Sequence, residues 1–263
     1  MKEKVALYED EWSAEIYDYQ VESTADVSFW LSLARESGGP GLELACGTGR
    51  VLLALARAGL EVTGLDLSPY MLAVARQKLA QEARDVQARV RLVEASMADF
   101  SLDRSFGLIY IPARAFQGLL TRARQQACLE SCRQHLRPGG RLAVDVFNPL
   151  LSKLIAPGGV DEEPDEFTGP RGAAVQQDAH TDYDLAEQTL LSVWRYETTC
   201  ERGAPVVHEY ALRLHYFFRF EMEWMLEVCG VEVEALYGDF DRSQFTAESP
   251  EMIFVARQKE EGQ

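Results

Sequence analysis

The sequence has few of the residues that build metal centres and disulfide frameworks. It contains five cysteines, an odd number, and only four scattered histidines. No two cysteines form a C-x-x-C pair, which disfavours a disulfide framework and a structural zinc site and favours a reducing compartment. We therefore predict no bound metal. Cys128 and Cys132, four residues apart on an expected helix, are interpreted as small core residues.

Positive charge is also scarce. The 26 Lys and Arg residues are outnumbered by 42 Asp and Glu residues, which gives a formal net charge of −16 at pH 7. A protein that binds the phosphate backbone of a nucleic acid needs a clustered basic surface. We therefore expect no nucleic-acid partner, while the composition leaves a small-molecule partner open.

Long apolar runs are missing as well. No segment reaches the roughly 18 apolar residues of a membrane-spanning helix, and the first residues lack the apolar region of a signal peptide. We expect a cytoplasmic protein with no membrane partner, either a monomer or a homodimer. The hydrophobic content of 47% supports a sizeable core in one α/β domain with an insertion, or in two small domains.

Strand and helix signals alternate through the first 150 residues. The expected strands are residues 41–46, 60–66, 90–94, 107–111 and 141–147. Between them, we expect helices that start with a capping-box-like Ser23 to Asp26 and run to Ser37, span 49–58, begin at Ser68-Pro69, and span 121–136. Residues 137–140 (RPGG) are expected to form a turn that stops the last helix. Strands joined by such helices are typical of βαβ units in a parallel sheet with helices on both faces.

The pattern changes after residue 149. Residues 157–170, rich in Gly, Pro and acids, predict an exposed loop, and residues 171–216 alternate like antiparallel strands. One face of the last of these strands carries His208, Tyr210, Leu212, Leu214 and Tyr216, and the other carries Glu209, Arg213 and His215. This alternation predicts a small sheet that covers something apolar. A helix over 217–229 and strands over 231–237 and 252–257 are expected to follow.

A glycine-containing turn follows the first expected strand, in the stretch LELACGTGR (residues 42–50). A dinucleotide fingerprint needs a third glycine three residues after Gly49, and Leu52 stands there instead. A phosphate-binding P-loop needs a lysine after its last glycine, and Arg50 follows here. Both phosphate-binding interpretations therefore lose support.

The turn resembles the first motif of the class I S-adenosylmethionine-dependent methyltransferases, an acid followed by small residues and G-x-G. Glu43, Gly47 and Gly49 match it, and Ala45 replaces a residue that is often glycine. Further marks follow in order: Asp66 at the end of the second strand, the helix start Ser68-Pro69, and the turn at 137–140. A carboxylate at Asp66 suits a ribose diol. Glu43 is expected to tie its strand to the turn.

The resemblance implies a Rossmann-like, doubly wound fold. It predicts a seven-stranded, mostly parallel sheet with an antiparallel C-terminal strand, plus a small antiparallel β insertion. The expected domains are an N-terminal helical cap (1–40), a cofactor-binding core (41–149 and 217–263) and an inserted substrate lid (150–216).

The same resemblance implies S-adenosylmethionine as cofactor, with S-adenosylhomocysteine as product. The cofactor-binding candidates are Tyr17, Glu43, Ala45, Gly47, Gly49, Arg50, Asp66, Leu67, Met71, Ser96, Met97 and Ile111. Among them, Ser96 stands where the family often has Asp, and Tyr17 stands where small-molecule members have a tyrosine that closes over the ligand.

The expected reaction is in-line transfer of a methyl group to an amine or hydroxyl of a small molecule. It requires the acceptor to be held close to the methyl carbon, and a base only if the acceptor arrives protonated, so no catalytic base is assigned. The N-P-P-[YF] signature of nucleic-acid methylation is missing at residues 110–113. The substrate-binding candidates are Arg114, Phe116, Trp194, Tyr196 and Tyr210. Two alternatives stay open, a non-catalytic module that binds the nucleoside and an NAD(P)-dependent oxidoreductase.

Overall fold

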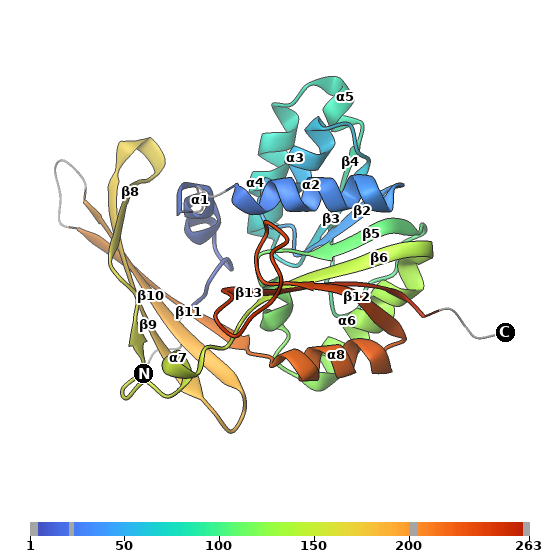
Figure 1. Ribbon diagram of the computed structural model, residues 1–263. Helices are drawn as coiled ribbons and strands as arrows, with labels where there is room; N and C mark the ends of the chain where they lie inside the picture. The colour runs from blue at the N-terminus through green and yellow to red at the C-terminus, as the bar shows by residue number, and fades with distance from the viewer. Residues whose placement is uncertain (1–4, 21–23, 200–204, 260–263) are drawn as a thin grey trace.

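The computed structural model describes residues 5–20, 24–199 and 205–259, which form two β-sheets with a short helix between them (Figure 1). The larger sheet comes from the two ends of the chain, and the smaller sheet comes mainly from the segment between them. Helix α1 (Glu11–Gln20) lies in the space between the sheets.

The large sheet has seven strands in the order β12-β13-β6-β5-β2-β3-β4. These are β2 (Gly41–Leu44), β3 (Val62–Asp66), β4 (Val90–Glu94), β5 (Phe106–Ile111), β6 (Leu136–Phe147), β12 (Val231–Tyr237) and β13 (Glu251–Gln258). Strand β13 runs antiparallel to both β6 and β12, while β2 to β6 pair in parallel. This arrangement confirms the predicted Rossmann-like fold with its antiparallel C-terminal strand.

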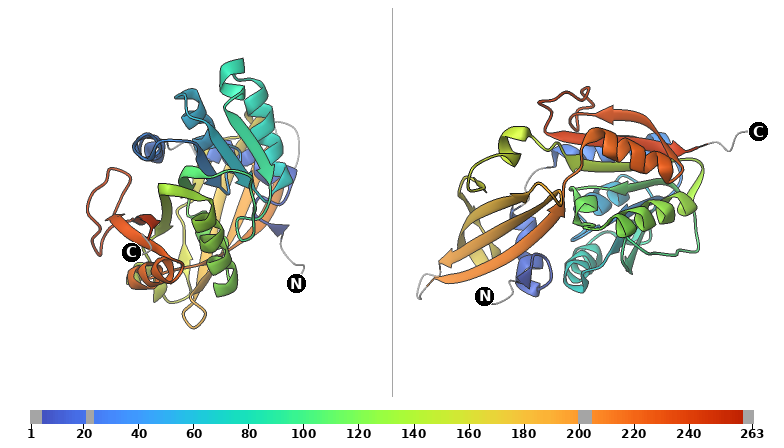
Figure 2. Two further views of the ribbon diagram at one scale, coloured as in Figure 1. Left: turned by 90° about the vertical axis from the view of Figure 1, so that its right-hand side faces the viewer. Right: turned by 90° about the horizontal axis from the view of Figure 1, so that it is seen from below.

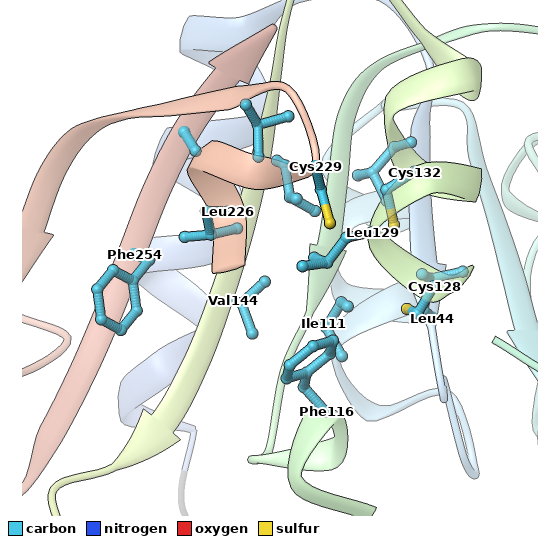
Figure 3. Packing of buried hydrophobic residues seen from close by; sticks show 14 of the residues in the cluster. Leu44, Ile111, Phe116, Cys128, Leu129, Cys132, Val144, Leu226, Cys229 and Phe254 are labelled. Carbon is cyan, nitrogen blue, oxygen red and sulfur yellow. The ribbon is translucent and has the colours of Figure 1, made fainter. Parts of the chain in front are cut away.

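Helices cover both faces of the large sheet, because each face carries apolar side chains at alternate strand positions (Figure 2). One face is covered by α2 (Ala25–Ser37), α3 (Arg50–Arg57) and α5 (Arg84–Gln87). The other is covered by α6 (Arg122–His135) and α8 (Arg219–Val228). Cys128 and Cys132, on the inner face of α6, are fully buried, as predicted, and Cys229 lies beside them (Figure 3). Cys200 lies outside the described residues.

The predicted helix starts had different outcomes. Helix α4 (Pro69–Ala80) begins as expected, since the Oγ of Ser68 accepts a hydrogen bond from the N–H of Met71 at 3.2 Å. Helix α2 begins at Ala25, within the predicted start, and its N-cap residue Thr24 makes no side-chain hydrogen bond. The predicted capping box depends on Ser23, which lies outside the described residues. The carboxylate of Asp26 instead forms an ion pair with Arg50, which competes with a capping role.

The expected turn at residues 137–140 lies inside a strand. Strand β6 starts at Leu136, and its pairing with β5 shifts between Phe106 and Leu108. Gly139, with φ of 74°, supplies the left-handed backbone that this irregularity needs. The helix stop was therefore predicted at the right place, but as a turn rather than a bulge.

The small sheet has the strand order β1-β11-β10-β9-β7, with β8 also paired to β9. Its strands are β1 (Val5–Ala6), β7 (Val160–Asp161), β8 (Asp165–Thr168), β9 (Ala174–Asp184), β10 (Thr189–Thr199) and β11 (Val206–His215). The antiparallel meander of β9, β10 and β11 confirms the predicted β insertion. All pairs in this sheet are antiparallel except β1 with β11, which is parallel.

The sequence did not predict the edge strands of the small sheet. The expected loop over 157–170 contains β7 and β8, which gain backbone pairing from β9. Half-buried Phe167 also packs against the apolar cluster of this sheet. The segment expected as a helical cap, residues 1–40, contains α1 and α2 and also β1, which pairs with β11 at the other edge. Short edge strands depend on a distant partner, so local composition does not reveal them.

Helix α1 joins the two sheets. On the small-sheet side, the Trp12 ring stacks on His208 with centroids 3.9 Å apart, and the Tyr210 hydroxyl donates to Asp10 at 2.9 Å. On the other side, the Asp18 carboxylate accepts a hydrogen bond from Thr48 Oγ1 at 2.6 Å. The helix is therefore bonded to the glycine turn of the large sheet and to the aromatic face of the small sheet.

Candidate active site

A cavity of about 590 Å³ opens between the carboxyl ends of the parallel strands and the inner face of the small sheet. Its large-sheet wall includes Glu43, Ala45, Gly47, Arg50, Asp66, Met71 and the loop of residues 112–115. Its small-sheet wall includes Thr181, Tyr183, Leu190, Ser192, Trp194, Leu212 and Leu214. The cavity lies where ligands bind in open α/β sheets.

The backbone of the glycine turn has a tight conformation. Ala45, Gly47 and Gly49 all have positive φ, of 55°, 53° and 80°. A Cβ on Gly47 would lie 3.1 Å from the Cε of Met71, so this position accepts only glycine without displacing a cavity residue. Gly49 is the N-cap of α3. Ala45 adopts the left-handed conformation at the cost of strain, which accounts for glycine at this position in the family motif.

Asp66 holds the turn from the neighbouring strand. Its Oδ2 accepts a hydrogen bond from the N–H of Gly47 at 2.7 Å, and its Oδ1 accepts one from the N–H of Ser68 at 2.8 Å. Burial raises the pKa of Asp66, and these N–H groups act against that rise. Asp66 also lines the cavity, so its carboxylate can accept hydrogen bonds from a ligand's hydroxyls.

The sequence predicted that Glu43 would link β2 to the glycine turn, but the structure shows no hydrogen bond between Glu43 and the described residues of the turn. The Glu43 carboxylate accepts a hydrogen bond from the Tyr110 hydroxyl of β5 at 2.8 Å, and Asp66 supplies the link instead. Glu43 lies inside β2 and is paired with Tyr110 of β5, which brings the Tyr110 hydroxyl within reach of its carboxylate. Burial raises the pKa of Glu43 to about 8, so a cation bound beside it would favour its charged form.

Arg50 closes one end of the cavity through a cluster of polar side chains. Its guanidinium makes a two-point ion pair with Asp26, at 2.6 and 2.7 Å. The phenol of Tyr17 is hydrogen-bonded to the same arginine. This cluster places α1 and α2 beside the turn, and it brings the predicted residues Tyr17 and Arg50 together at the cavity wall.

Tyr8 is a cavity residue that the sequence reasoning missed. Its φ is 72°, its N–H donates to Ser13 Oγ at 3.1 Å, and its carbonyl accepts a hydrogen bond from Ser68 Oγ at 2.7 Å. Its ring meets the Tyr17 ring edge-on, with centroids 5.3 Å apart. A lone aromatic residue near the N-terminus carries no pattern that predicts such a place.

Five of the predicted cofactor residues do not line this cavity. Gly49 lies just behind it as the N-cap of α3. Leu67 is 62% exposed, and the Oγ of Ser96 accepts a hydrogen bond from its neighbour Ala98 at 3.2 Å. Met97 packs against the hydrophobic core. Ile111 is fully buried in that core, on the face covered by α6 and α8 (Figure 3). Leu67, Ser96 and Met97 nonetheless follow the carboxyl ends of β3 and β4, next to Asp66.

The predicted substrate residues divide in the same way. Arg114 and Trp194 line the cavity, on opposite walls. Phe116 is fully buried beside Ile111 in the core, because the short helix after the loop turns its ring inward (Figure 3). Tyr196 and Tyr210 form the aromatic core between the small sheet and α1, and their hydroxyls donate to Gln20 and Asp10. Phe116, Tyr196 and Tyr210 therefore do not line the cavity, and the prediction that they contact the substrate is not supported by their positions.

Two features of the described ranges bear on the class of site. Within residues 5–20, 24–199 and 205–259, no three His, Cys, Asp or Glu side chains are grouped so that they could hold a metal ion. Over the same described ranges, no helix is both long enough and apolar enough to cross a membrane.

The known proteins that this chain resembles are methyltransferases. Residues 42–140 match the family described as methyltransferase domain. The cypemycin N-terminal methyltransferase of Streptomyces sp is 28% identical over 250 residues, which are 94% of this chain and 96% of that protein. The dTDP-3-amino-3,6-dideoxy-alpha-D-glucopyranose N,N-dimethyltransferase of Streptomyces fradiae is 29% identical over 197 residues, 75% of this chain and 71% of that protein. The CcbJ methyltransferase structure from Streptomyces caelestis has a TM-score of 0.77 at 26% identity, covering 96% of this chain and 98% of that one.

The strand order, the G-x-G turn and the carboxylate that holds it define an S-adenosylmethionine-dependent methyltransferase. The chain belongs to the class I S-adenosylmethionine-dependent methyltransferase superfamily. Its cofactor is S-adenosylmethionine. Neither the oxidoreductase alternative nor the non-catalytic alternative receives support from these relatives.

Proposed function

We propose that this protein transfers a methyl group from S-adenosylmethionine to the amine of a small molecule. One observation carries the proposal: a single cavity is lined by the turn with Gly47 and Asp66 and by the loop and lid residues Arg114 and Trp194. Donor and acceptor can therefore occupy one cavity, as in-line transfer requires. Both curated relatives described above carry names that specify transfer to nitrogen.

Within this proposal, S-adenosylmethionine, when bound, supplies the electrophilic methyl group. Asp66 binds the ribose hydroxyls, and the backbone of residues 45–49 lies along the amino-acid part of the ligand. Tyr17, Glu43 and Arg50 line the same end of the cavity and hold the charged groups of that part. The small sheet excludes water from the acceptor half with Leu190, Leu212, Leu214 and the ring of Trp194.

The composition of the cavity wall favours an amine over a hydroxyl acceptor. A hydroxyl must lose its proton as it attacks, which requires a base with a suitable pKa. No histidine is among the described residues that line the cavity. Burial raises the pKa values of the lining phenols Tyr8, Tyr17 and Tyr183, which makes them poor bases near neutral pH. An amine can enter neutral and release its proton after transfer.

The acidic charge of the protein supports the same assignment. Glu162 lines the cavity, and it lies close enough to Tyr183 and Arg114 to influence both electrostatically. A carboxylate at this place attracts a protonated amine from water, and the amine gives its proton to water before it enters the cavity as the neutral nucleophile. The net charge of −16 acts in the same direction over a longer range.

The test is a transfer assay with a radiolabelled methyl donor and matched acceptors. The panel contains amino sugars, peptides with a free N-terminus, and the analogue of each in which a hydroxyl replaces the amine. We expect label on the amines and none on their hydroxyl partners. Transfer to the hydroxyl compounds alone would assign the other acceptor type. Binding of S-adenosylhomocysteine without transfer to any member would overturn the proposal.

A further inference from the structure

The loop that follows β5 has an unusual backbone. Ala113 and Arg114 are consecutive, neither is glycine, and both adopt left-handed conformations with φ of 58° and 59°. Each such residue costs about 1–2 kcal/mol relative to right-handed backbone. Strain of this kind persists only where the surrounding structure imposes it. Both residues line the cavity, so the strained turn is part of its wall.

A buried carboxyl group holds the backbone of this turn. The Oδ2 of Asp145, on β6, accepts a hydrogen bond from the N–H of Arg114 at 3.0 Å. Asp145 is only 1% exposed, and its other oxygen, Oδ1, has no hydrogen-bond partner among the described residues. Burying a carboxyl for a single hydrogen bond is expensive. Its neighbours in β6, Val144 and Val146, show that this strand is otherwise built for an apolar interior.

A second carboxylate holds the side chain of the same arginine. The Nε of Arg114 donates to Glu251 at 3.1 and 3.2 Å, and its Nη2 bonds to the same carboxylate. Glu251 lies on β13, directly opposite Phe147 of β6, and is 6% exposed. Two adjacent strands therefore hold the backbone and the side chain of one loop residue.

We propose that Asp145 is the positioning residue of the acceptor loop: through the N–H of Arg114 it holds residues 112–115 in the left-handed turn that forms the acceptor wall. Asp145 does not line the cavity itself, so it acts through the loop and not on the substrate. The proposal rests on the proposed function, because that function makes this wall the acceptor side. Two different carboxylates then position the two binding regions. Asp66 holds the turn that binds the donor, and Asp145 holds the loop that binds the acceptor.

Substitutions at Asp145 separate the hydrogen bond from the charge. Asp145→Asn keeps an oxygen that can accept the Arg114 N–H, and Asp145→Ala removes it. We expect Asp145→Ala to increase amide hydrogen exchange in the peptide of residues 111–118 by about tenfold, the value of one typical hydrogen bond. The acceptor KM should rise by a similar factor, with a smaller change in kcat. Asp145→Asn should match the wild-type protein in both.

Two further variants make the interpretation specific. Ala113→Gly, introduced into Asp145→Ala, relieves strain at one of the two residues and should bring exchange and KM back toward the wild-type values. Ala113 is exposed, and Ala113→Val disfavours the left-handed conformation, so this variant should loosen the loop even if Asp145→Ala fails to fold. Thr63→Val, which removes another buried oxygen without a partner among the described residues, is the matched control and should leave the loop unchanged.

The measurements distinguish this proposal from the proposed function. Calorimetric titration with S-adenosylhomocysteine should give the same affinity, within about twofold, for every variant. An Asp145→Ala protein with unchanged exchange and unchanged acceptor KM would overturn the positioning role. So would an equal loss of S-adenosylhomocysteine affinity, or Asp145→Asn behaving like Asp145→Ala. Hydrogen exchange needs no acceptor, so the role of Asp145 is decided even if the amine panel shows no transfer.

Discussion

The Oδ2 of Asp66 and the backbone N–H of Gly47 are joined by a hydrogen bond of 2.7 Å. One carboxylate thus shapes the turn and faces the cavity that the turn lines. We expect Asp66→Ala to weaken S-adenosylhomocysteine binding by about 1–3 kcal/mol, because hydrogen bonds to a charged group are lost. Isothermal titration calorimetry measures the change, with exposed Asp85→Ala as the control. An unchanged affinity would remove Asp66 from the cofactor site.

Gly47 is predicted to tolerate no side chain. In Gly47→Ala the new Cβ would press on Met71 Cε at 3.1 Å, and the residue would keep an unfavourable φ of 53°. Donor affinity should fall by at least about tenfold, the equivalent of about 1.4 kcal/mol. Gly59→Ala is the matched control, since Gly59 also has a positive φ but a Cβ there would meet no described atom within 4 Å. The control should lose stability only, and equal loss of affinity in both variants would contradict the steric argument.

S-adenosylhomocysteine should stabilise the folded protein, and NAD should not. A ligand that binds only the native state at about 100 times its Kd adds about 2.7 kcal/mol to the free energy of unfolding. The melting temperature, followed by differential scanning fluorimetry with each ligand, gives the result directly. A higher melting temperature with NAD and none with S-adenosylhomocysteine would be incompatible with S-adenosylmethionine as the cofactor.

The buried carboxyl of Glu43 makes stability depend on pH. Its folded-state pKa is raised to about 8 by burial, above the value of about 4.3 that an unfolded glutamate has. The folded state therefore binds the proton more tightly. The contribution of Glu43 is fully present below about pH 4 and is lost as pH rises through about 8.

The variant Glu43→Gln tests this dependence, because glutamine is neutral throughout and can still accept the Tyr110 hydroxyl. Urea unfolding between about pH 5 and pH 9 should show a shallower loss of stability in the variant than in the wild-type protein. Some dependence should remain, since burial also raises the pKa of Asp145 to about 8. Parallel curves for the two proteins would show that Glu43 titrates near its ordinary pKa.

The large sheet and the donor turn could be predicted from the sequence because their signals are local. The apolar strands, Ser68 before Pro69, and the glycines at 47 and 49 each determine backbone conformation within a few residues. The carboxylate of Asp66 was predicted as a ligand group by its place at a strand end. Its second role, holding Gly47, connects residues 19 apart and becomes visible only in the structure.

The acceptor half could be predicted only in outline, because its contacts join distant parts of the chain. Alternation in β11 correctly put Tyr210 and Leu212 on one face, but it does not reveal what covers each residue. Tyr210 is covered by α1 and bonds to Asp10, 200 residues away, while Leu212 faces the cavity. The strained turn at Ala113 has no composition signal either, since the carboxylate that holds it lies on another strand.

Helix α1 contacts the small sheet through Trp12 and through Asp10, the residue before it, and it is bonded to the glycine turn through Asp18. A small sheet with few contacts to the rest of a protein would melt separately. Here, detaching it exposes the aromatic cluster around Trp12 and frees the helix that lies against Thr48. The two sheets are therefore one cooperative unit, and calorimetry should record a single endotherm whose van't Hoff and calorimetric enthalpies agree.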